Sequence, residues 1–93
     1  PNVYYRNLPG QFIAGTLYDP IEEEVIKGAR CMAVSGGRIL NVYSDEFGDF
    51  WFKDLAVGEY DITITARGFR PKYCFGVSTK ECVNLGDIPL ERA

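Results

Sequence analysis

Apolar and polar residues alternate in several short stretches of this chain, with Gly, Pro, Asp and Ser between the stretches. In Glu59–Arg67 every second side chain is apolar: Tyr60, Ile62, Ile64 and Ala66. Because successive side chains of a strand point to opposite faces, this period predicts a strand with one buried face. No stretch keeps the period of a helix.

Seven strands are predicted in this way, with turns about every 8–12 residues. They are expected at Gln11–Tyr18, Ala29–Val34, Arg38–Tyr43, Phe50–Lys53, Glu59–Arg67, Lys72–Val77 and Cys82–Leu90. Ile21–Lys27, which contains three successive glutamates, is expected to be an acidic loop. Residues 1–10 are expected to be an extended lead-in, and 11–93 one domain. Short strands at this spacing predict an all-β sandwich or barrel.

Composition excludes several classes of function. The formal net charge of −3 is spread along the chain and forms no basic patch, so we expect no nucleic-acid partner. No apolar run approaches the roughly 20 residues of a membrane span. The chain has no histidine, which excludes imidazole catalysis and histidine-ligated zinc within it. Because it starts at Pro1, we expect it to be a fragment or a processed product of a longer protein. We expect the fragment itself to be non-catalytic.

The three cysteines, Cys31, Cys74 and Cys82, are too few for a disulfide-rich scaffold. Their spacing matches no zinc or iron–sulfur ligand pattern, so we expect no cofactor or metal on this chain. A single bridge between Cys74 and Cys82 stays open. Reduced thiols packed among other side chains are favoured.

Aromatic residues are the candidate functional residues. If Phe50 and Phe52 face the core, Trp51 faces outward, where it can anchor a protein interface or lie across a neighbouring strand. Tyr4, Tyr5 and Tyr43 are further candidates for the same interface patch. The alternative is that these rings stack on a sugar, which requires two or three of them to be coplanar on one face.

Acidic residues offer a second candidate site. Glu22–Glu24 and the pair Asp45 and Asp49 carry carboxylates suited to a cation, but their spacing is not that of a calcium loop. We therefore expect Asp45 to cap its own turn by accepting hydrogen bonds from backbone N–H groups. The glutamates are expected to be a solvated loop.

The stretch from Ser44 to Phe69 resembles the signature of carboxypeptidase-regulatory-like domains, which have the transthyretin-like (prealbumin-like) fold. The matching residues are Ser44, Asp45, Gly48, Phe50, Phe52, Leu55, Gly58, Tyr60, Gly68 and Phe69. Phe12–Leu17, Gly28–Cys31 and Leu85–Leu90 resemble the opening, second and closing strands of these domains. The resemblance implies a seven-stranded antiparallel Greek-key β-sandwich. It implies no particular function, because this fold hosts many.

A narrower resemblance lies at the start of the chain. Val3–Pro9, running into Phe12–Pro20, is similar to a junction in ferredoxin-type iron–sulfur subunits of molybdopterin oxidoreductases, in the branch of the pyrogallol–phloroglucinol transhydroxylase small subunit. It implies a C-terminal structural domain that helps docking. Its partners would be the cluster-binding part of the same chain and a molybdopterin catalytic subunit, with 4Fe–4S clusters upstream, in the bacterial cytoplasm or periplasm. The alternative is a free-standing or extracellular carbohydrate- or protein-binding module.

Overall fold

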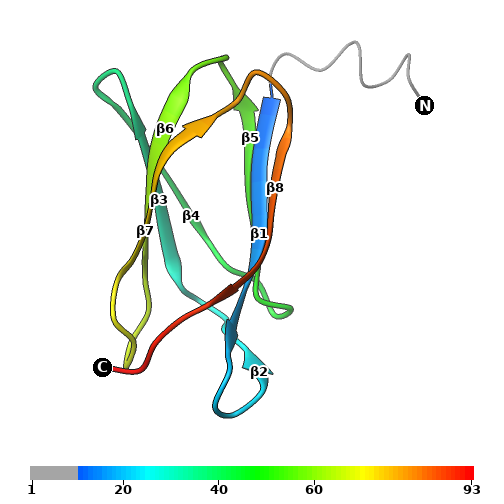
Figure 1. Cartoon of the computed structure of the whole chain (residues 1–93), viewed down its shortest axis with the longest axis vertical. Coiled ribbons are helices and arrows are strands. Elements are labelled where there is room, and N and C mark those ends of the chain that lie inside the picture. Colours follow the sequence, from blue (N-terminus) through cyan, green and yellow to red (C-terminus); the bar gives the residue numbers. More distant parts are fainter. Residues whose placement is uncertain (1–10) are drawn as a thin grey trace, which may run out of the picture.

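The computed structural model describes residues 11–93, which form two facing β-sheets. Its strands are β1 (Gln11–Asp19), β2 (Glu24–Val25), β3 (Arg30–Ser35), β4 (Arg38–Tyr43), β5 (Asp49–Leu55), β6 (Glu59–Thr65), β7 (Lys72–Ser78) and β8 (Val83–Pro89). Figure 1 shows the sheet of β1, β2, β5 and β8 on one side and that of β3, β4, β6 and β7 on the other. The prediction of an all-β sandwich is confirmed. Residues 11–93 contain no helix long and apolar enough to cross a membrane.

The prediction of seven strands is wrong by one, because a short strand forms inside the acidic loop. Asp19 Oδ1 accepts hydrogen bonds from the backbone N–H groups of Ile21, at 2.9 Å, and Glu22, at 3.3 Å. This cap folds the chain back tightly enough for β2 to pair with the end of β1. The glutamates of the loop are exposed.

Neighbouring strands are antiparallel except β1 and β8, which run parallel. The prediction of a wholly antiparallel arrangement therefore misses one pairing. Its cause is the connection after β7, which crosses from one sheet to the other and brings β8 to the edge of β1 in the same direction (Figure 1). The Greek-key connectivity stays a prediction.

The core lies between the sheets and follows the predicted alternation. Ile13, Gly15 and Leu17 of β1 face it. Phe50 and Phe52 of β5 also face it, with ring centroids 6.0 Å apart and planes at 70°. From the second sheet come Cys31, Ala33, Tyr60, Ile62 and Ile64. Along most of β1, β3, β5 and β6, every second residue is buried in this way. The residues between them form the outer faces of the two sheets.

The Ser44–Asp45 pair of the family signature holds the turn before β5. The buried Ser44 hydroxyl donates to the Ile26 carbonyl at 2.7 Å and accepts from the Ala29 N–H at 2.9 Å. Asp45 Oδ1 accepts from the backbone N–H groups of Phe47 at 2.9 Å and Asp49 at 3.0 Å, which confirms the predicted cap.

Gly48 completes this turn. Its φ of +79° lies in the region that favours glycine, and a Cβ there would be 2.6 Å from the Leu17 carbonyl oxygen. The turn positions the first residue of β5, Asp49, against β1.

Candidate functional site

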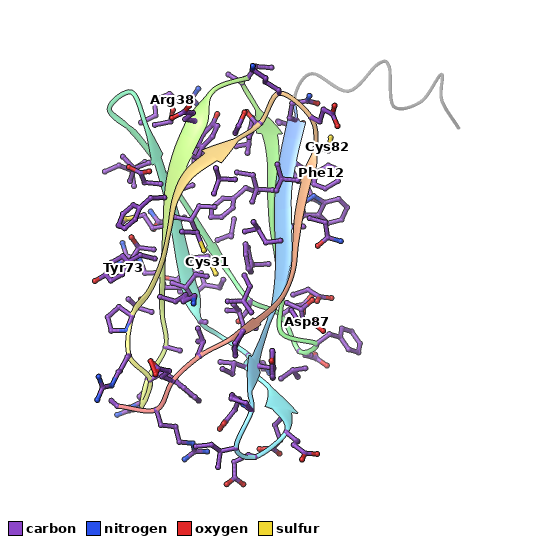
Figure 2. The ribbon with its side chains drawn as sticks, viewed as in Figure 1. Phe12, Cys31, Arg38, Tyr73, Cys82 and Asp87 are labelled. Atoms are coloured by element: carbon purple, nitrogen blue, oxygen red, sulfur yellow. The ribbon has the colours of Figure 1, made fainter. Side chains whose placement is uncertain are left out.

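The outer face of the β1–β5–β8 sheet combines aromatic and acidic side chains. We call it the Trp51 face; its residues are Phe12, Ala14 and Thr16 on β1, Asp49, Trp51 and Lys53 on β5, and Asn84 and Asp87 on β8. β1 lies between β5 and β8, so its side chains form the middle of this face. Figure 2 shows Phe12 and Asp87 on this side of the molecule, while Tyr73 projects from the opposite sheet.

Strand register orders the Trp51 face into rows. In one row, Ala14 lies between Trp51 and Asn84. In the next row, Thr16 lies between an aspartate on each side, Asp49 and Asp87. Side chains opposite each other on neighbouring strands are close enough to interact. The middle residue of each row therefore has a small side chain, and the residues at its two ends have larger side chains.

A groove of about 410 Å³ results from these small residues. It is lined by Phe12, Ala14, Gly15, Thr16, Asp45, Asp49, Phe50, Trp51 and Asn84. Its volume falls within the range of about 300–1,000 Å³ that small-molecule sites occupy. The groove lies open on the sheet, so it can also receive a side chain of another protein.

Trp51 forms the aromatic end of the groove and is 53% exposed. Its ring meets that of Phe12 edge to face, with centroids 5.8 Å apart and planes at 80°. The ammonium group of Lys53 lies 4.5 Å from the centre of the Trp51 ring. The ring thus already engages a cation through its π face.

Polar groups form the other end of the groove. The Thr16 hydroxyl donates to Asp49 Oδ1 at 2.5 Å. Asn84 Oδ1 accepts from the backbone N–H of Gly86 at 2.9 Å. The groove lining includes the carboxylates of Asp45 and Asp49 and no lysine or arginine.

Tyr43 and Trp51, the two predicted interface aromatics within the described residues, lie on different sheets and form no common patch. Tyr43 is 64% exposed, but it lies on β4 and alternates with Leu40 and Val42, which pack against the core. It therefore faces outward from the second sheet, opposite to Trp51. Tyr4 and Tyr5 lie outside the described residues. A role for these residues in an interface stays a prediction.

Sequence reasoning missed a second aromatic pair on the outer face of the second sheet. Tyr73 and Phe75 of β7 are 53% and 72% exposed, and their rings stack with centroids 5.8 Å apart and planes at 6°. Alternation around Cys74, which packs against the core, was the signal that could have found them. Phe12 was likewise missed as the neighbour of Trp51.

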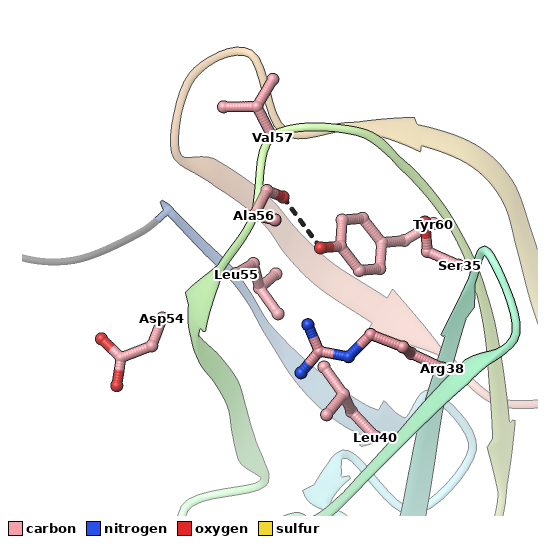
Figure 3. Close-up of a pocket in the computed structure, with 8 residues that line it drawn as sticks. All are labelled: Ser35, Arg38, Leu40, Asp54, Leu55, Ala56, Val57 and Tyr60. Atoms are coloured by element: carbon pink, nitrogen blue, oxygen red, sulfur yellow. Dashed lines mark hydrogen bonds between the residues drawn. The ribbon is translucent and has the colours of Figure 1, made fainter.

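A smaller hollow of about 100 Å³ lies at one end of the sandwich, between β4 and the turn from β5 to β6. Figure 3 shows Arg38 reaching across it and the Tyr60 hydroxyl donating to the Ala56 carbonyl, at 2.8 Å. Its volume is well below that of small-molecule sites, which start at about 300 Å³. Another hollow, of about 370 Å³, is similar in volume to the groove, but the Asp19 carboxylate in its lining is already paired with Arg92 at 2.6 Å. We place the candidate site on the Trp51 face because its groove is lined by an exposed tryptophan.

The described residues offer no metal site and no reactive thiol pair. Residues 11–93 contain no cluster of three or more His, Cys, Asp or Glu side chains that could hold a metal ion. All three cysteines are free, so the bridge that the sequence left open between Cys74 and Cys82 does not form. Burial raises the pKa of the Cys31 thiol to about 12, which keeps it protonated and unreactive.

Solved structures with the same fold come from proteins of several kinds. The chain is similar to one in a type II cohesin–X-dockerin complex of Acetivibrio cellulolyticus, with a TM-score of 0.68 and 23% identity over 84% of this chain and 53% of that one. It is also similar to the major pilin subunit of Bacillus cereus, with a TM-score of 0.62 and 19% identity over 89% of this chain and 30% of that one.

A third similar structure is a candidate carbohydrate-binding protein of Bacteroides uniformis, with a TM-score of 0.65 and 17% identity over 88% of this chain and 41% of that one. At these identities the similarity shows the fold alone. The chain spans about half or less of the length of these three solved chains.

No curated protein sequence matches the chain significantly. The sequence pattern of the carboxypeptidase regulatory-like domain matches residues 13–90, which include all eight strands except the first two residues of β1. Its signature residues have clear structural tasks here: Ser44 and Asp45 hold a turn, and Phe50 and Phe52 fill the core. The chain therefore belongs to the carboxypeptidase regulatory-like domain family.

Proposed function

We propose that this chain is a non-catalytic protein-binding module that docks through the Trp51 face. The observation that carries the proposal is the half-exposed Trp51 beside Phe12 at the edge of an open groove. Tryptophan is enriched among the residues that dominate interface energies, because it buries a large area with little loss of side-chain freedom.

Two further observations support a binding role over a catalytic one. The family is named for regulatory domains. Two of the similar solved structures are a protein complex and a subunit of a pilus, which are assemblies of proteins. The chain spans part of each of those proteins, so a module within a larger protein is the corresponding arrangement.

Carbohydrate binding is the second candidate, favoured by the polar groups of Thr16, Asp49 and Asn84 beside Trp51 and by one similar structure. Sugar rings stack on a free, flat aromatic face. Here Phe12 stands at 80° to Trp51, and Lys53 lies over the Trp51 ring. A sugar on that side would have to displace the ammonium group. Protein docking needs no such platform, so we favour it.

Site-specific cross-linking tests the proposal. A photoreactive phenylalanine analogue replaces Trp51 in the full-length protein in its native cells, and the control carries it at Tyr73 on the opposite sheet. We expect position 51 to form a protein adduct that position 73 does not form. The adduct is identified by mass spectrometry, and the purified partner should then bind the wild-type chain and not Trp51→Ala. Equal adducts from both positions would contradict docking through this face.

Fluorescence tests the carbohydrate alternative. Trp51 is the only tryptophan, so its emission reports directly on the groove. Titration with a panel of oligosaccharides should leave the emission unchanged. A saturable change that Asp49→Asn removes would favour sugar binding over protein binding.

The wider setting of the module as the C-terminal domain of an iron–sulfur subunit remains a second proposal. It rests on the resemblance of residues 3–20, part of which lies outside the described residues. The similar solved structures fit a free-standing or extracellular binding module better. Anaerobic expression of the full-length protein followed by iron analysis tests it, since 4Fe–4S clusters upstream would give several irons per chain. An iron-free, colourless protein would remove this setting and leave the protein-binding proposal intact.

A further inference from the structure

The groove on the Trp51 face has an aromatic end and an acidic end. Along β5, Asp49, Trp51 and Lys53 follow one another on the same face. Trp51 therefore has a carboxylate on one side and an ammonium group on the other. Lys53 does not line the groove, whereas Asp49 does. A ligand in the groove therefore meets the indole and the carboxylates, and the lysine approaches it only through the Trp51 ring.

Negative charge dominates this part of the surface. Asp45 and Asp49 line the groove, and Asp87 is exposed beside Thr16, in the same row as Asp49. Asp45 uses its Oδ1 for two backbone N–H groups, and Asp49 uses its Oδ1 for the Thr16 hydroxyl. Within residues 11–93, the Oδ2 atoms of both aspartates accept no hydrogen bond and form no ion pair, so they are available to a donor.

We propose that the groove receives an arginine side chain from an extended basic segment of a partner protein. This inference rests on the proposed protein-binding function and names the chemistry of the partner. The guanidinium group stacks on aromatic rings and donates in a planar fork to carboxylates, which is the combination of walls that the groove offers. The small side chain of Ala14 leaves room for the aliphatic stem between Trp51 and Asn84.

Two features of the site favour an arginine side chain over a metal ion. No group of three or more His, Cys, Asp or Glu side chains within residues 11–93 is arranged to hold a metal ion. An elongated cation with several donors suits separated acceptors better than a single ion does. The Lys53 ammonium lies 4.5 Å from the Trp51 ring centre, so this indole already engages one cation, and a guanidinium group must stack on ring surface that Lys53 leaves free or take the place of its ammonium group.

Peptide display on the purified chain tests the inference. Random short peptides are selected against the wild-type chain, and the affinities of the selected peptides are measured through the fluorescence of Trp51. For the variants that lack this tryptophan, calorimetry replaces fluorescence. Trp51→Ala removes the aromatic wall, and Asp49→Asn removes one charge while keeping an acceptor for Thr16. Tyr73→Ala and Glu59→Gln are the matched controls, because both residues are exposed on strands of the other sheet.

We expect the selected peptides to be enriched in arginine. Asp49→Asn and Trp51→Ala should each weaken their binding about tenfold or more, whereas the two controls should leave it unchanged. Binding should weaken as the salt concentration rises.

The outcomes separate this inference from the proposed function. Peptides that depend on Trp51 but carry no basic residue, or that tolerate Asp49→Asn, would overturn the arginine site and leave protein binding in place. A selection in which no peptide depends on Trp51 would overturn both. Circular dichroism and thermal unfolding of each variant establish that it is folded before its affinity is compared.

Discussion

Gly15 shows how a single missing Cβ allows the core to close. It faces inward on β1, and a Cβ at this position would lie 2.8 and 2.9 Å from two carbons of the buried Phe50 ring and 3.2 Å from Ile88 Cδ1. Phe50 is 2% exposed, so its ring has little room to move. We expect Gly15→Ala to lower the free energy of unfolding by about 1–3 kcal/mol, as overpacking of a core does. Denaturation with urea measures the loss.

Gly58→Ala is the matched control for this substitution. Gly58 is not among the glycines with positive φ, and the nearest atom to an added Cβ would be Ser35 Oγ at 3.8 Å. A change at this position reports the general effect of replacing glycine, which is under about 1 kcal/mol where the backbone allows it. Equal losses at both positions would show that contact with Phe50 is not the cause.

The three thiols differ in burial and should differ in reactivity. Cys31 is fully buried and its pKa is raised to about 12, whereas Cys82 is exposed. Since the thiolate is the reactive form, we expect a maleimide to label Cys82 in the native protein and to reach Cys31 only after unfolding. Mass spectrometry of labelled peptides checks the order. Rapid labelling of Cys31 under native conditions would show that the sandwich opens far more readily than its packing implies.

Ser44 connects two loops at the scale of elements. Its hydroxyl bridges the Ile26 carbonyl and the Ala29 N–H, and its own backbone N–H donates to the Ala29 carbonyl at 3.0 Å. Ser44→Ala leaves a buried carbonyl and a buried N–H without this partner, so we expect a loss of about 1–3 kcal/mol in unfolding free energy. The exposed Ser78 provides the control substitution, Ser78→Ala, which should change stability little. A similar loss in both variants would contradict the role given to the Ser44 hydroxyl.

The sequence predicted elements better than their assembly. Alternation in Glu59–Arg67 and the turn chemistry of Asp45 and Gly48 are local, so both could be predicted without a structure. The pairing of β2 depends on the Asp19 cap, and the parallel β1–β8 pair depends on a crossover between sheets, so neither leaves a periodic signal.

For the candidate site, the sequence likewise predicted the position of single residues but not how the strands bring them together. Trp51 could be placed on an outer face because Phe50 and Phe52 flank it, and Tyr43 was a further candidate for the same patch. Which sheet each residue joins is a property of the fold, and it separated Tyr43 from Trp51. The groove arises from the register of Ala14 against Trp51 and Asn84, which come from three distant segments.

At the scale of the whole molecule, the segment after β8 joins the two sheets. Leu90 N–H donates to the Tyr18 carbonyl of β1 at 3.0 Å. Glu91 and Gly68 accept from the N–H groups of Arg70 and Ala93, which pairs this segment with the connection between β6 and β7. We call these three hydrogen bonds the tie. The tie lies at the end of the sandwich opposite to the β5–β6 turn, so it can be perturbed without touching the Trp51 face (Figure 1).

Asp19 and Arg92 give this tie a dependence on pH. Arg92 Nη2 lies 2.6 Å from Asp19 Oδ2, and this hydrogen bond is the main cause that lowers the pKa of the Asp19 carboxyl below its ordinary value. A carboxyl whose pKa is lower in the folded state stabilises the fold above its unfolded pKa, and the contribution disappears as pH falls through the folded value. The stabilisation should therefore be complete near pH 7 and should decline below about pH 4.

We expect Arg92→Met to unfold at a lower temperature than the wild-type chain at pH 7, and the difference to shrink steadily as the pH falls below about 4, where Asp19 becomes protonated in both proteins. Thermal unfolding followed by circular dichroism across this range measures the difference. Arg67→Met is the control, because Arg67 is exposed. This substitution removes the same charge from the same end of the molecule. A difference in unfolding temperature between Arg92→Met and the wild-type chain that stays constant with pH would contradict a role for Asp19. It would mean that Arg92 stabilises the tie by packing on Phe69, where its Cζ lies 5.8 Å from the ring centre.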